Sequence, residues 1–263
     1  MRVGDLRIRG LLLTIFADLI LPRGGELGIA ELQKIVVAIG LEPGAVRTAT
    51  SRLVADGRLR RRREGRHSIY RMSERQLTRV TELVPRVYAA SGPGESANWL
   101  MVWLEEDHCA QALREAGFLC PAPQLFLWPL SKGAPPDILP SDAILCRGPL
   151  TLPARRRAAL CRPEVLDAIR ALGADLQAVA ALDDISEEVA IGIRVLMIHR
   201  WRNLILDHPD LPPEVQPSDW PVEEVRGAVA SCYRKLMQPS EHWLRRNIPQ
   251  FAETPWNDLP TRF

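Results

Sequence analysis

The first ninety residues of this 263-residue chain contain three helical patterns followed by two short basic strands. Apolar residues recur at helical spacing, and glycine or proline closes the pattern, in three stretches: 6–20, 29–39 and 43–56. The strand patterns cover 58–63 and 67–72, and the Glu64-Gly65-Arg66 segment between them is typical of a hairpin turn. A further helix begins after the capping residue Ser73 and reaches about residue 90. This order of elements predicts a winged helix-turn-helix.

In a winged helix-turn-helix, the third helix enters the major groove of DNA, and the hairpin lies along the backbone or the minor groove. The third helix here has an apolar face formed by Val46, Ala49, Leu53 and Val54. The polar positions that remain are Arg47, Thr48, Ser51 and Arg52. Because arginine and hydroxyl side chains bind base edges and phosphates, we expect these four residues to bind DNA. The alternative is an exposed helix whose arginines pair with Glu42 and Asp56.

The hairpin carries seven arginines: Arg58, Arg60, Arg61, Arg62, Arg63, Arg66 and Arg71. Since alternate residues of a strand face opposite ways, some of them must point back toward the helices. We expect phosphate contacts from a smaller set in the hairpin and at its tip: Arg61, Arg63, Arg66 and His67. Two alternatives remain for this run of arginines. It could be only a solvated face, as runs of charge ordinarily are, or the basic hairpin could bind an acidic protein.

Basic residues are concentrated in this first part of the chain. Residues 1–90 hold 17 Lys and Arg against nine Asp and Glu, a net charge of +8, whereas the remainder carries −6, for a total of +2. Charge that is segregated in this way indicates a polyanionic partner for the basic part.

The composition changes at 91–96, a segment rich in glycine, serine and proline that is typical of a linker. Strand, helix, strand and strand patterns between 99 and 146 predict a small α/β domain. Helical patterns then cover 163–181, 186–206 and 221–237, with a short stretch after Ser240. We therefore expect an α+β chain of three domains: a winged helix over 1–92, an α/β domain over 93–160 and a helical domain over 161–263.

Several motifs occur in order along the chain. The first part holds Leu21-Pro22-Arg23-Gly24-Gly25, Val46-Arg47-Thr48-Ala49 and Arg63-Glu64-Gly65-Arg66-His67-Ser68-Ile69-Tyr70. The middle holds Gly117-Phe118 and Leu127-Trp128-Pro129, and the last part holds Arg200-Trp201-Arg202, His208-Pro209-Asp210-Leu211-Pro212-Pro213-Glu214 and Pro217-Ser218-Asp219-Trp220-Pro221. Together they resemble the PaaX family of transcriptional repressors of phenylacetate catabolism.

The resemblance implies a winged-helix domain, a central ferredoxin-like domain similar to the small CRISPR-associated endoribonuclease, and a helical C-terminal domain for effector binding and dimerisation. It implies a homodimer that represses a catabolic operon by binding double-stranded, palindromic operator DNA. It also implies release by an aryl-acetyl-CoA thioester, phenylacetyl-CoA in the namesake. We expect no enzyme activity, cofactor or metal.

Two further residue groups have alternative interpretations. His199, Arg200, Trp201 and Arg202 are adjacent on one predicted helix and could form a pocket for a CoA-type anion; the alternative is a helix surface rich in structural ion pairs. The ferredoxin-like resemblance raises a metal-dependent nuclease, whose carboxylates would be Glu105, Glu106 and Asp107. Acidic residues also commonly begin helices, where the helix dipole favours them.

Other classes of protein find no support in the sequence. The five cysteines form no CxxC pair, which indicates free thiols and favours a cytoplasmic location. We find no apolar run long enough to span a membrane and no cleavage site after the apolar stretch at 11–17, so we expect neither membrane association nor a signal peptide. Phosphate-loop, dinucleotide-binding, nucleophile-elbow and zinc-protease motifs are missing from the sequence.

Overall fold

The computed structural model describes residues 8–89, 91–105, 109–206, 211–252 and 262–263. It combines helices with two antiparallel sheets, so the expected α+β class is confirmed. The chain divides into two compact units: Met1–Ala90 with Leu172–Asn203 and Arg226–Phe263, and Ser91–Ala171 with Leu204–Val225. The helical last third of the chain, expected as one domain over 161–263, is shared between these units. The division into three domains therefore stays a prediction.

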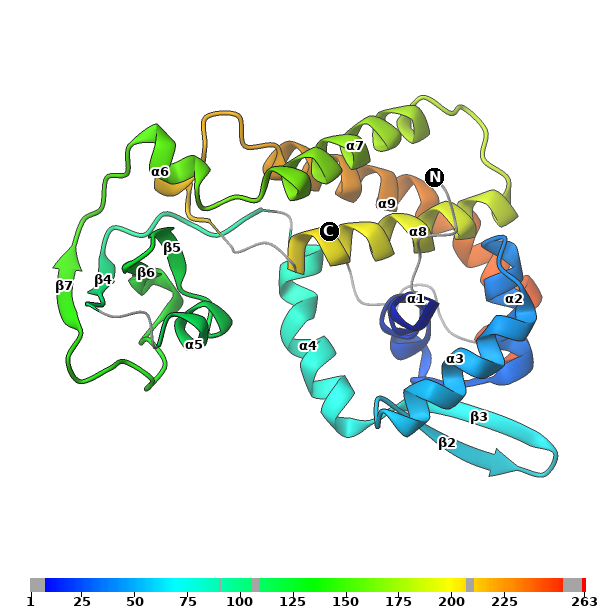
Figure 1. Ribbon diagram of the computed structural model, residues 1–263. Helices are drawn as coiled ribbons and strands as arrows, with labels where there is room; N and C mark the ends of the chain where they lie inside the picture. Colours follow the sequence, from blue (N-terminus) through cyan, green and yellow to red (C-terminus); the bar gives the residue numbers. More distant parts are fainter. Residues whose placement is uncertain (1–7, 90, 106–108, 207–210, 253–261) are drawn as a thin grey trace. The chain divides into compact units, whose positions relative to one another are not determined.

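The first unit joins the N-terminal helices and hairpin to long helices from the end of the chain (Figure 1). Its N-terminal elements are α1 (Ile8–Ile15), a π-helical turn (Phe16–Ile20), a 3-10 turn (Leu21–Arg23), β1 (Glu26–Gly28), α2 (Ile29–Ala38), α3 (Pro43–Ala55), β2 (Leu59–Glu64), β3 (His67–Met72) and α4 (Glu74–Tyr88). The unit is completed by parts of three helices and a 3-10 turn from the end of the chain: α7 (Pro163–Ala180), α8 (Glu187–Leu206), α9 (Val222–Asn247) and the turn Pro249–Phe251.

Helix α1 lies at the centre of this unit. Its residues from Leu11 to Ile15 are all buried, and a helix that is apolar on every side must be enclosed by other elements. The same core includes residues of α2 and α3 together with Val195 of α8 and Leu244 of α9. The first ninety residues therefore share their core with the end of the chain.

The sheet of the first unit has the strand order β1-β3-β2, and both pairs are antiparallel. Gly57, with a φ of +67°, ends α3 and leads into β2. The hydroxyl of Ser73 accepts a hydrogen bond from the Gln76 amide over 3.3 Å, which confirms the predicted cap of α4. Strand β1 was missing from the sequence prediction, because three residues are too few to show an alternating pattern.

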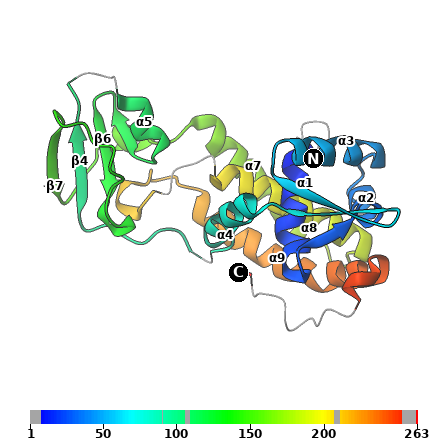
Figure 2. The same ribbon diagram turned by 90° about the horizontal axis from the view of Figure 1, so that it is seen from below.

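The second unit contains a four-stranded antiparallel sheet with the order β5-β6-β4-β7. Its elements are β4 (Trp99–Trp103), α5 (Ala110–Glu115), β5 (Leu119–Ala122), β6 (Leu125–Pro129), a 3-10 turn (Leu130–Lys132), β7 (Ile144–Gly148), α6 (Ala154–Ala158) and a 3-10 turn (Pro213–Val215). Figure 2 shows β7, β4 and β6 side by side. Leu100 and Val102 pack with Leu113 of α5, whereas Trp99 packs with Leu152 and Val215 in a separate cluster.

Two further elements of the structure differ from the sequence prediction. We expected a helix to end at 237 and a short stretch to follow Ser240, but α9 continues through Pro239 to Asn247. Leu236, Ser240 and Leu244 are all fully buried, so burial of one continuous face outweighs the hydrogen bond that proline cannot make. Strand β5 was not predicted, because it is short and contains Pro121.

Candidate nucleic-acid interface

Helix α3 presents a polar face to solvent. Val46, Ala49 and Leu53 are buried as expected, whereas Val54 is only half-buried. Thr50 is also buried, and its hydroxyl donates to the Val46 carbonyl over 2.8 Å. The four residues predicted to bind DNA are all exposed: Arg47, Thr48, Ser51 and Arg52. Apolar burial thus orients α3 so that these four side chains lie on its outer surface.

The alternative interpretation of α3 required its arginines to form ion pairs with neighbouring acids. Asp56 instead pairs with Arg9, at 3.1 Å between Nη1 and Oδ2. Within the described residues, Arg47, Arg52 and Glu42 take part in no ion pair. The outer face of α3 therefore carries two positive charges that no acid of the described chain neutralises.

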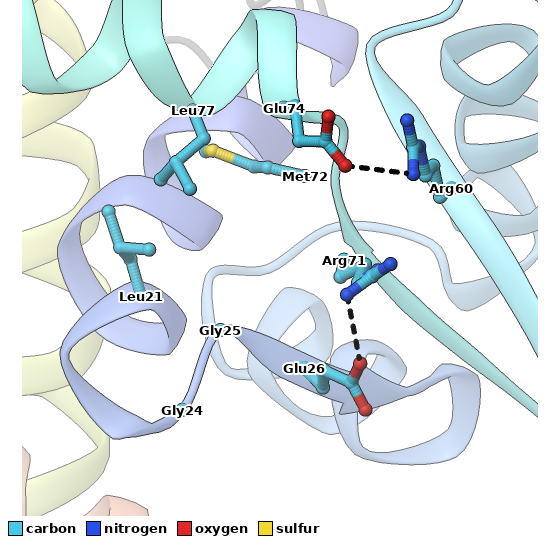
Figure 3. A pocket seen from close by; sticks show the side chains of 9 residues that line it. All are labelled: Leu21, Gly24, Gly25, Glu26, Arg60, Arg71, Met72, Glu74 and Leu77. Atoms are coloured by element: carbon cyan, nitrogen blue, oxygen red, sulfur yellow. Dashed lines mark ion pairs between the residues drawn. The ribbon is translucent and has the colours of Figure 1, made fainter.

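The arginines of the hairpin are divided between its two faces. Arg60 lies opposite Arg71, and Arg62 lies on the same side of β2 as Arg60. Acidic side chains meet this face. Arg60 pairs with Glu74 at 3.1 Å, and Arg71 pairs with Glu26 at 4.0 Å (Figure 3). Arg62 also pairs with Glu26, at 3.0 Å. The hydrogen bond to Glu26 raises the pKa of Arg62 above its usual range.

These ion pairs border a small pocket between the base of the hairpin and the start of α4. The rest of its lining is Leu21, Gly24, Gly25, Met72 and Leu77 (Figure 3). The arginines on this face of the hairpin therefore serve contacts within the unit, and their charge is matched locally.

The opposite face of the hairpin remains cationic. Leu59 and Tyr70 of this face are buried, whereas Arg61, which lies opposite Tyr70, and Arg63, which is nearer the turn, are exposed. Arg66 and His67 are exposed at the turn. None of Arg61, Arg63 and Arg66 forms an ion pair in the part of the chain that the structure describes. These are the hairpin residues that the sequence analysis selected.

One exposed arginine was not among the predicted contacts. Arg58 lies between α3 and β2, is exposed and has no ion pair among the residues described. Its place directly after Gly57, between the two candidate DNA-contacting elements, is the sequence signal that could have identified it.

The four residues considered for effector binding do not converge. His199 is buried and lies 2.9 Å from the Thr14 hydroxyl, and Trp201 donates from Nε1 to the Val87 carbonyl over 2.9 Å. Arg200 pairs with Asp175, and Arg202 donates to the Gly10 carbonyl. Burial, with a smaller contribution from Arg202, lowers the pKa of His199 to about 4, so its imidazole is neutral at pH 7. These contacts favour the alternative of a structural helix surface, and an effector role stays a prediction.

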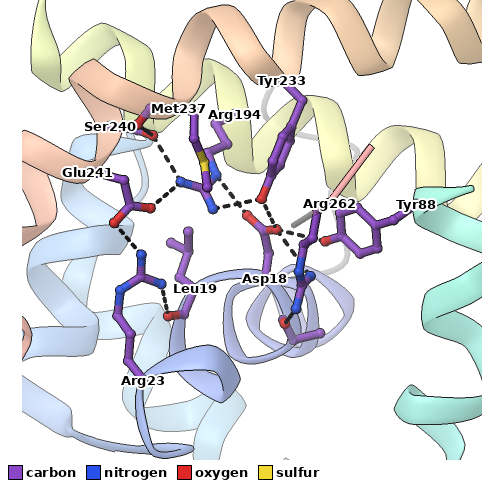
Figure 4. A network of polar contacts seen from close by, with 11 residues as sticks. Asp18, Leu19, Arg23, Tyr88, Arg194, Tyr233, Met237, Ser240, Glu241 and Arg262 are labelled. Atoms are coloured by element: carbon purple, nitrogen blue, oxygen red, sulfur yellow. Dashed lines mark hydrogen bonds and ion pairs between the residues drawn. The ribbon is translucent and has the colours of Figure 1, made fainter. Parts of the chain in front are cut away.

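A buried polar network that sequence reasoning missed lies beside α1 (Figure 4). Arg194 of α8 donates to Asp18 over 3.0 Å, to Glu241 over 2.7 Å and to the Tyr233 hydroxyl over 2.8 Å. Tyr88, the last residue of α4, donates to Asp18 over 2.7 Å. The network therefore joins the N-terminal helices, the end of α4 and the two C-terminal helices.

Charge balance within this network favours an ionised aspartate. Burial alone would raise the pKa of Asp18, but Arg194 and Arg262 outweigh burial and hold the pKa below its usual range. Arg23 binds Glu241 on the other side of Arg194. Buried charges are tolerated where they are paired and hydrogen-bonded in this way.

The carboxylates of the nuclease hypothesis cannot be placed as a group. Glu105 is exposed, while Glu106 and Asp107 lie outside the described residues. Over the described ranges, no group of three or more His, Cys, Asp and Glu side chains could hold a metal ion. Within the same ranges, no helix is both long and apolar enough to cross a bilayer.

Its fold and surface define this chain as an α+β protein with an exposed cationic helix and hairpin. The chain belongs to the PaaX-like protein family: residues 7–76 match the family's PaaX-like profile, and residues 165–246 match the profile of its C-terminal domain.

A curated relative and a solved structure are similar over most of the chain. The transcriptional repressor PaaX of Escherichia coli (strain K12) is 27% identical over 276 residues, which cover 95% of this chain and 85% of the relative. The structure of the uncharacterized protein Rv0674 from Mycobacterium tuberculosis has a TM-score of 0.54 and 21% identity, covering 88% of this chain and 96% of that one. The second likeness concerns the fold alone.

Proposed function

We propose that this chain is a transcriptional repressor that binds operator DNA through a winged helix-turn-helix formed by its N-terminal helices and hairpin. One observation carries the proposal: the arginines on the outer face of α3 and on one face of the hairpin have no acidic partner among the described residues, whereas those on the other face of the hairpin do. The similarity to a relative named as a transcriptional repressor supports it.

In this proposal, α3 enters the major groove and the hairpin follows the phosphate backbone. Arg47 and Arg52 bind base edges with help from the hydroxyls of Thr48 and Ser51. The hairpin set bound to phosphate is Arg61, Arg63, Arg66 and His67. Because each phosphate contact releases a counterion, binding weakens steeply as salt rises.

The resemblance to the family extends the proposal to regulation. The chain acts as a cytoplasmic homodimer on a palindromic operator, and an acyl-CoA-type effector such as phenylacetyl-CoA releases it. The effector binds the DNA-incompetent conformation more tightly than the competent one, which is the thermodynamic condition for release. Residues 93–160 are the ferredoxin-like domain of the family. The protein catalyses no reaction.

The division of the hairpin arginines provides a matched experiment. Arg61→Ala/Arg63→Ala removes two exposed charges that have no acidic partner among the described residues. Arg60→Ala/Arg62→Ala removes two charges that are also exposed but that acids already neutralise. Binding of the full chain to its own promoter region is measured by fluorescence anisotropy at several salt concentrations. We expect the first variant to lose at least tenfold in affinity, with a smaller salt slope, and the second to lose much less. Equal losses in the two variants, or wild-type binding by the first, would refute the proposed interface.

A further inference from the structure

The arginines of the second unit are concentrated in one stretch of the chain. Residues 143–163 hold five arginines and no Lys, Asp or Glu, whereas the rest of the unit holds three basic residues against fifteen acidic ones. Three of the five arginines are consecutive and form most of α6: Arg155, Arg156 and Arg157. Because positive charge gathered in this way attracts anions, the cluster indicates a polyanionic partner for this part of an otherwise acidic unit.

Neighbouring acids do not neutralise the arginines of α6. None of the three forms an ion pair with a residue that the structure describes, whereas Arg170 of the same unit pairs with both Asp167 and Asp219. Arg155 and Arg156 are exposed, and Arg157 is half-buried. The charge of α6 is therefore open to a partner outside the described chain, as is the charge on the outer face of α3.

Helix α6, which follows β7 in the chain, is held in place by the unit around it (Figure 1). Leu160, just after the helix, is buried in the apolar cluster of Trp99. Arg156 donates to the Pro121 carbonyl over 3.3 Å, and Arg157 donates to a backbone carbonyl of the 211–216 segment over 3.4 Å. Each bond uses few of the five N–H donors of a guanidinium, so the others remain for a ligand. A helix fixed in this way loses little conformational entropy on binding.

The side chains around these arginines favour phosphate as the ligand. The other exposed residues of the helix and its end are small, so an extended backbone can approach closely: Ala154, Ala158 and Ala159. Guanidinium groups bind phosphate oxygens through two parallel hydrogen bonds, which favours arginine at such a surface. Helix α6 carries no amide or hydroxyl side chain that would help to read base edges. The surface therefore fits a phosphate backbone of any sequence.

We propose that the arginines of α6 bind the phosphodiester backbone of duplex DNA, as a second contact separate from the winged helix. The proposal rests on the proposed function, in which α3 and the hairpin bring the chain to its operator. Two linked contacts to one duplex raise the overall affinity, because the second binding event is intramolecular. Since phosphate contacts carry no sequence information, α6 raises the affinity for operator and for unrelated duplex by a similar factor.

Salt-dependent binding of the full chain tests this contact. Fluorescence anisotropy measures binding to its own promoter region and to a random-sequence duplex of equal length. Arg155→Ala/Arg156→Ala should lose about tenfold or more in affinity for both duplexes and reduce the slope of log affinity against log salt concentration by about 2. Arg114→Ala/Arg170→Ala is the matched control, because it removes two exposed arginines of the same unit that already have a ring contact or ion pairs. The control should bind both duplexes like wild type.

Two further variants separate loss of charge from loss of fold. Arg155→Lys/Arg156→Lys keeps both charges and should retain most of the salt slope. Arg155→Ala alone removes a side chain that has no hydrogen bond or ion pair to a described residue, so it should fold like wild type and reduce the slope by about 1. Circular dichroism checks the fold of each variant, and Arg155→Ala decides the question if the double alanine variant unfolds.

The outcomes distinguish this contact from the proposed function. Wild-type affinity and slope in the α6 alanine variants, together with weakened binding by Arg61→Ala/Arg63→Ala, overturn the α6 contact and leave the winged helix standing. A wild-type chain that binds neither duplex overturns both. Equal losses in the α6 variant and the control would reflect net charge alone and also overturn the contact. If the α6 variant lost binding to a single-stranded RNA of the same length but kept duplex binding, the surface would belong to RNA and the proposal would be wrong.

Discussion

Arg194 donates a hydrogen bond from its Nε to Oδ2 of Asp18 over 3.0 Å, and both side chains are enclosed in the core of the first unit. The two residues are 176 positions apart in sequence. Their pairing holds the turn after α1 against α8, so the N-terminal elements and the C-terminal helices are connected by charge as well as by apolar packing.

Asp18→Asn should destabilise the protein severely, because it leaves Arg194 and Arg262 buried beside a neutral group. Removing one partner of a buried pair typically costs about 3–5 kcal/mol in the free energy of unfolding. Asp167→Asn, which affects an exposed pair with Arg170, should cost less than about 1 kcal/mol. Urea denaturation at pH 7 measures both, and equal costs would contradict the role of the network.

The stabilisation from Asp18 should also depend on pH. Its pKa in the folded protein lies below the usual 3.8, so the contribution is complete above that value and is lost as the pH falls through the lowered folded pKa. The stability difference between wild type and Asp18→Asn should therefore stay constant from pH 7 to 5 and narrow only in strong acid. A difference that already disappears at pH 5 would show that Asp18 is not held ionised.

His199 should make the protein less stable in mild acid. Its folded pKa is about 4 against an ordinary value of 6.5, so between these values the unfolded chain binds the proton and the folded chain does not. Stability should therefore rise with pH across this window, by at most about 1.4 kcal/mol per pH unit from this residue.

Variants at two histidines isolate this effect. His199→Gln should flatten the pH dependence of the urea midpoint between pH 4.5 and 6.5, while His242→Gln, at an exposed histidine, should retain it. An unchanged slope in His199→Gln would mean that other groups determine the pH dependence.

Arg47 and Arg61 should differ in what they contribute to DNA binding. Arg47→Ala should cost about 1–3 kcal/mol on the preferred operator and little on unrelated duplex, because a base contact is lost. Arg61→Ala should weaken binding to operator and to unrelated duplex to a similar extent, because a phosphate contact is lost. It should also reduce the slope of log affinity against log salt concentration by about 1. Competition binding with operator and scrambled duplexes distinguishes them. If Arg47→Ala weakened both duplexes equally, α3 would not be reading base edges.

Residues 262–263 should contribute to the stability of the first unit. The Arg262 guanidinium lies 4.3 Å from the ring centroid of Tyr88, and the Phe263 ring is edge-on to Tyr88 at 5.3 Å and to Tyr233 at 5.4 Å. Deleting the two residues should cost roughly 2–4 kcal/mol, from the lost ring contacts and the lost ion pair to Asp18. Arg246→Ala, at an exposed pair with Glu187, is the control in the same urea experiment. A midpoint unchanged by the deletion would contradict this packing.

Local patterns predicted the elements that bear the candidate interface. The spacing of Val46, Ala49 and Leu53 oriented α3, and the run of arginines around Gly65 identified the hairpin. These features depend on neighbours within a few residues, and the chain shows them directly. The same reasoning selected Arg61 and Arg63 from the hairpin run.

Long-range pairing could not be predicted in the same way. Asp18 stands in an apolar run, and nothing near it in sequence indicates that Arg194 and Glu241 will surround it. The acid that pairs with Arg62 and Arg71 is Glu26 of β1, a strand too short to show a pattern. The buried contacts of His199 and Trp201 likewise follow from tertiary packing, which helical spacing does not show.

The two faces of the hairpin differ in how strongly they attract a double-stranded polyanion. Glu26 and Glu74 neutralise the arginines on one face of the hairpin. An approaching duplex is therefore attracted to the other face. The sense in which the protein lies along the double helix would then be chosen during the encounter, before a single base pair is inspected.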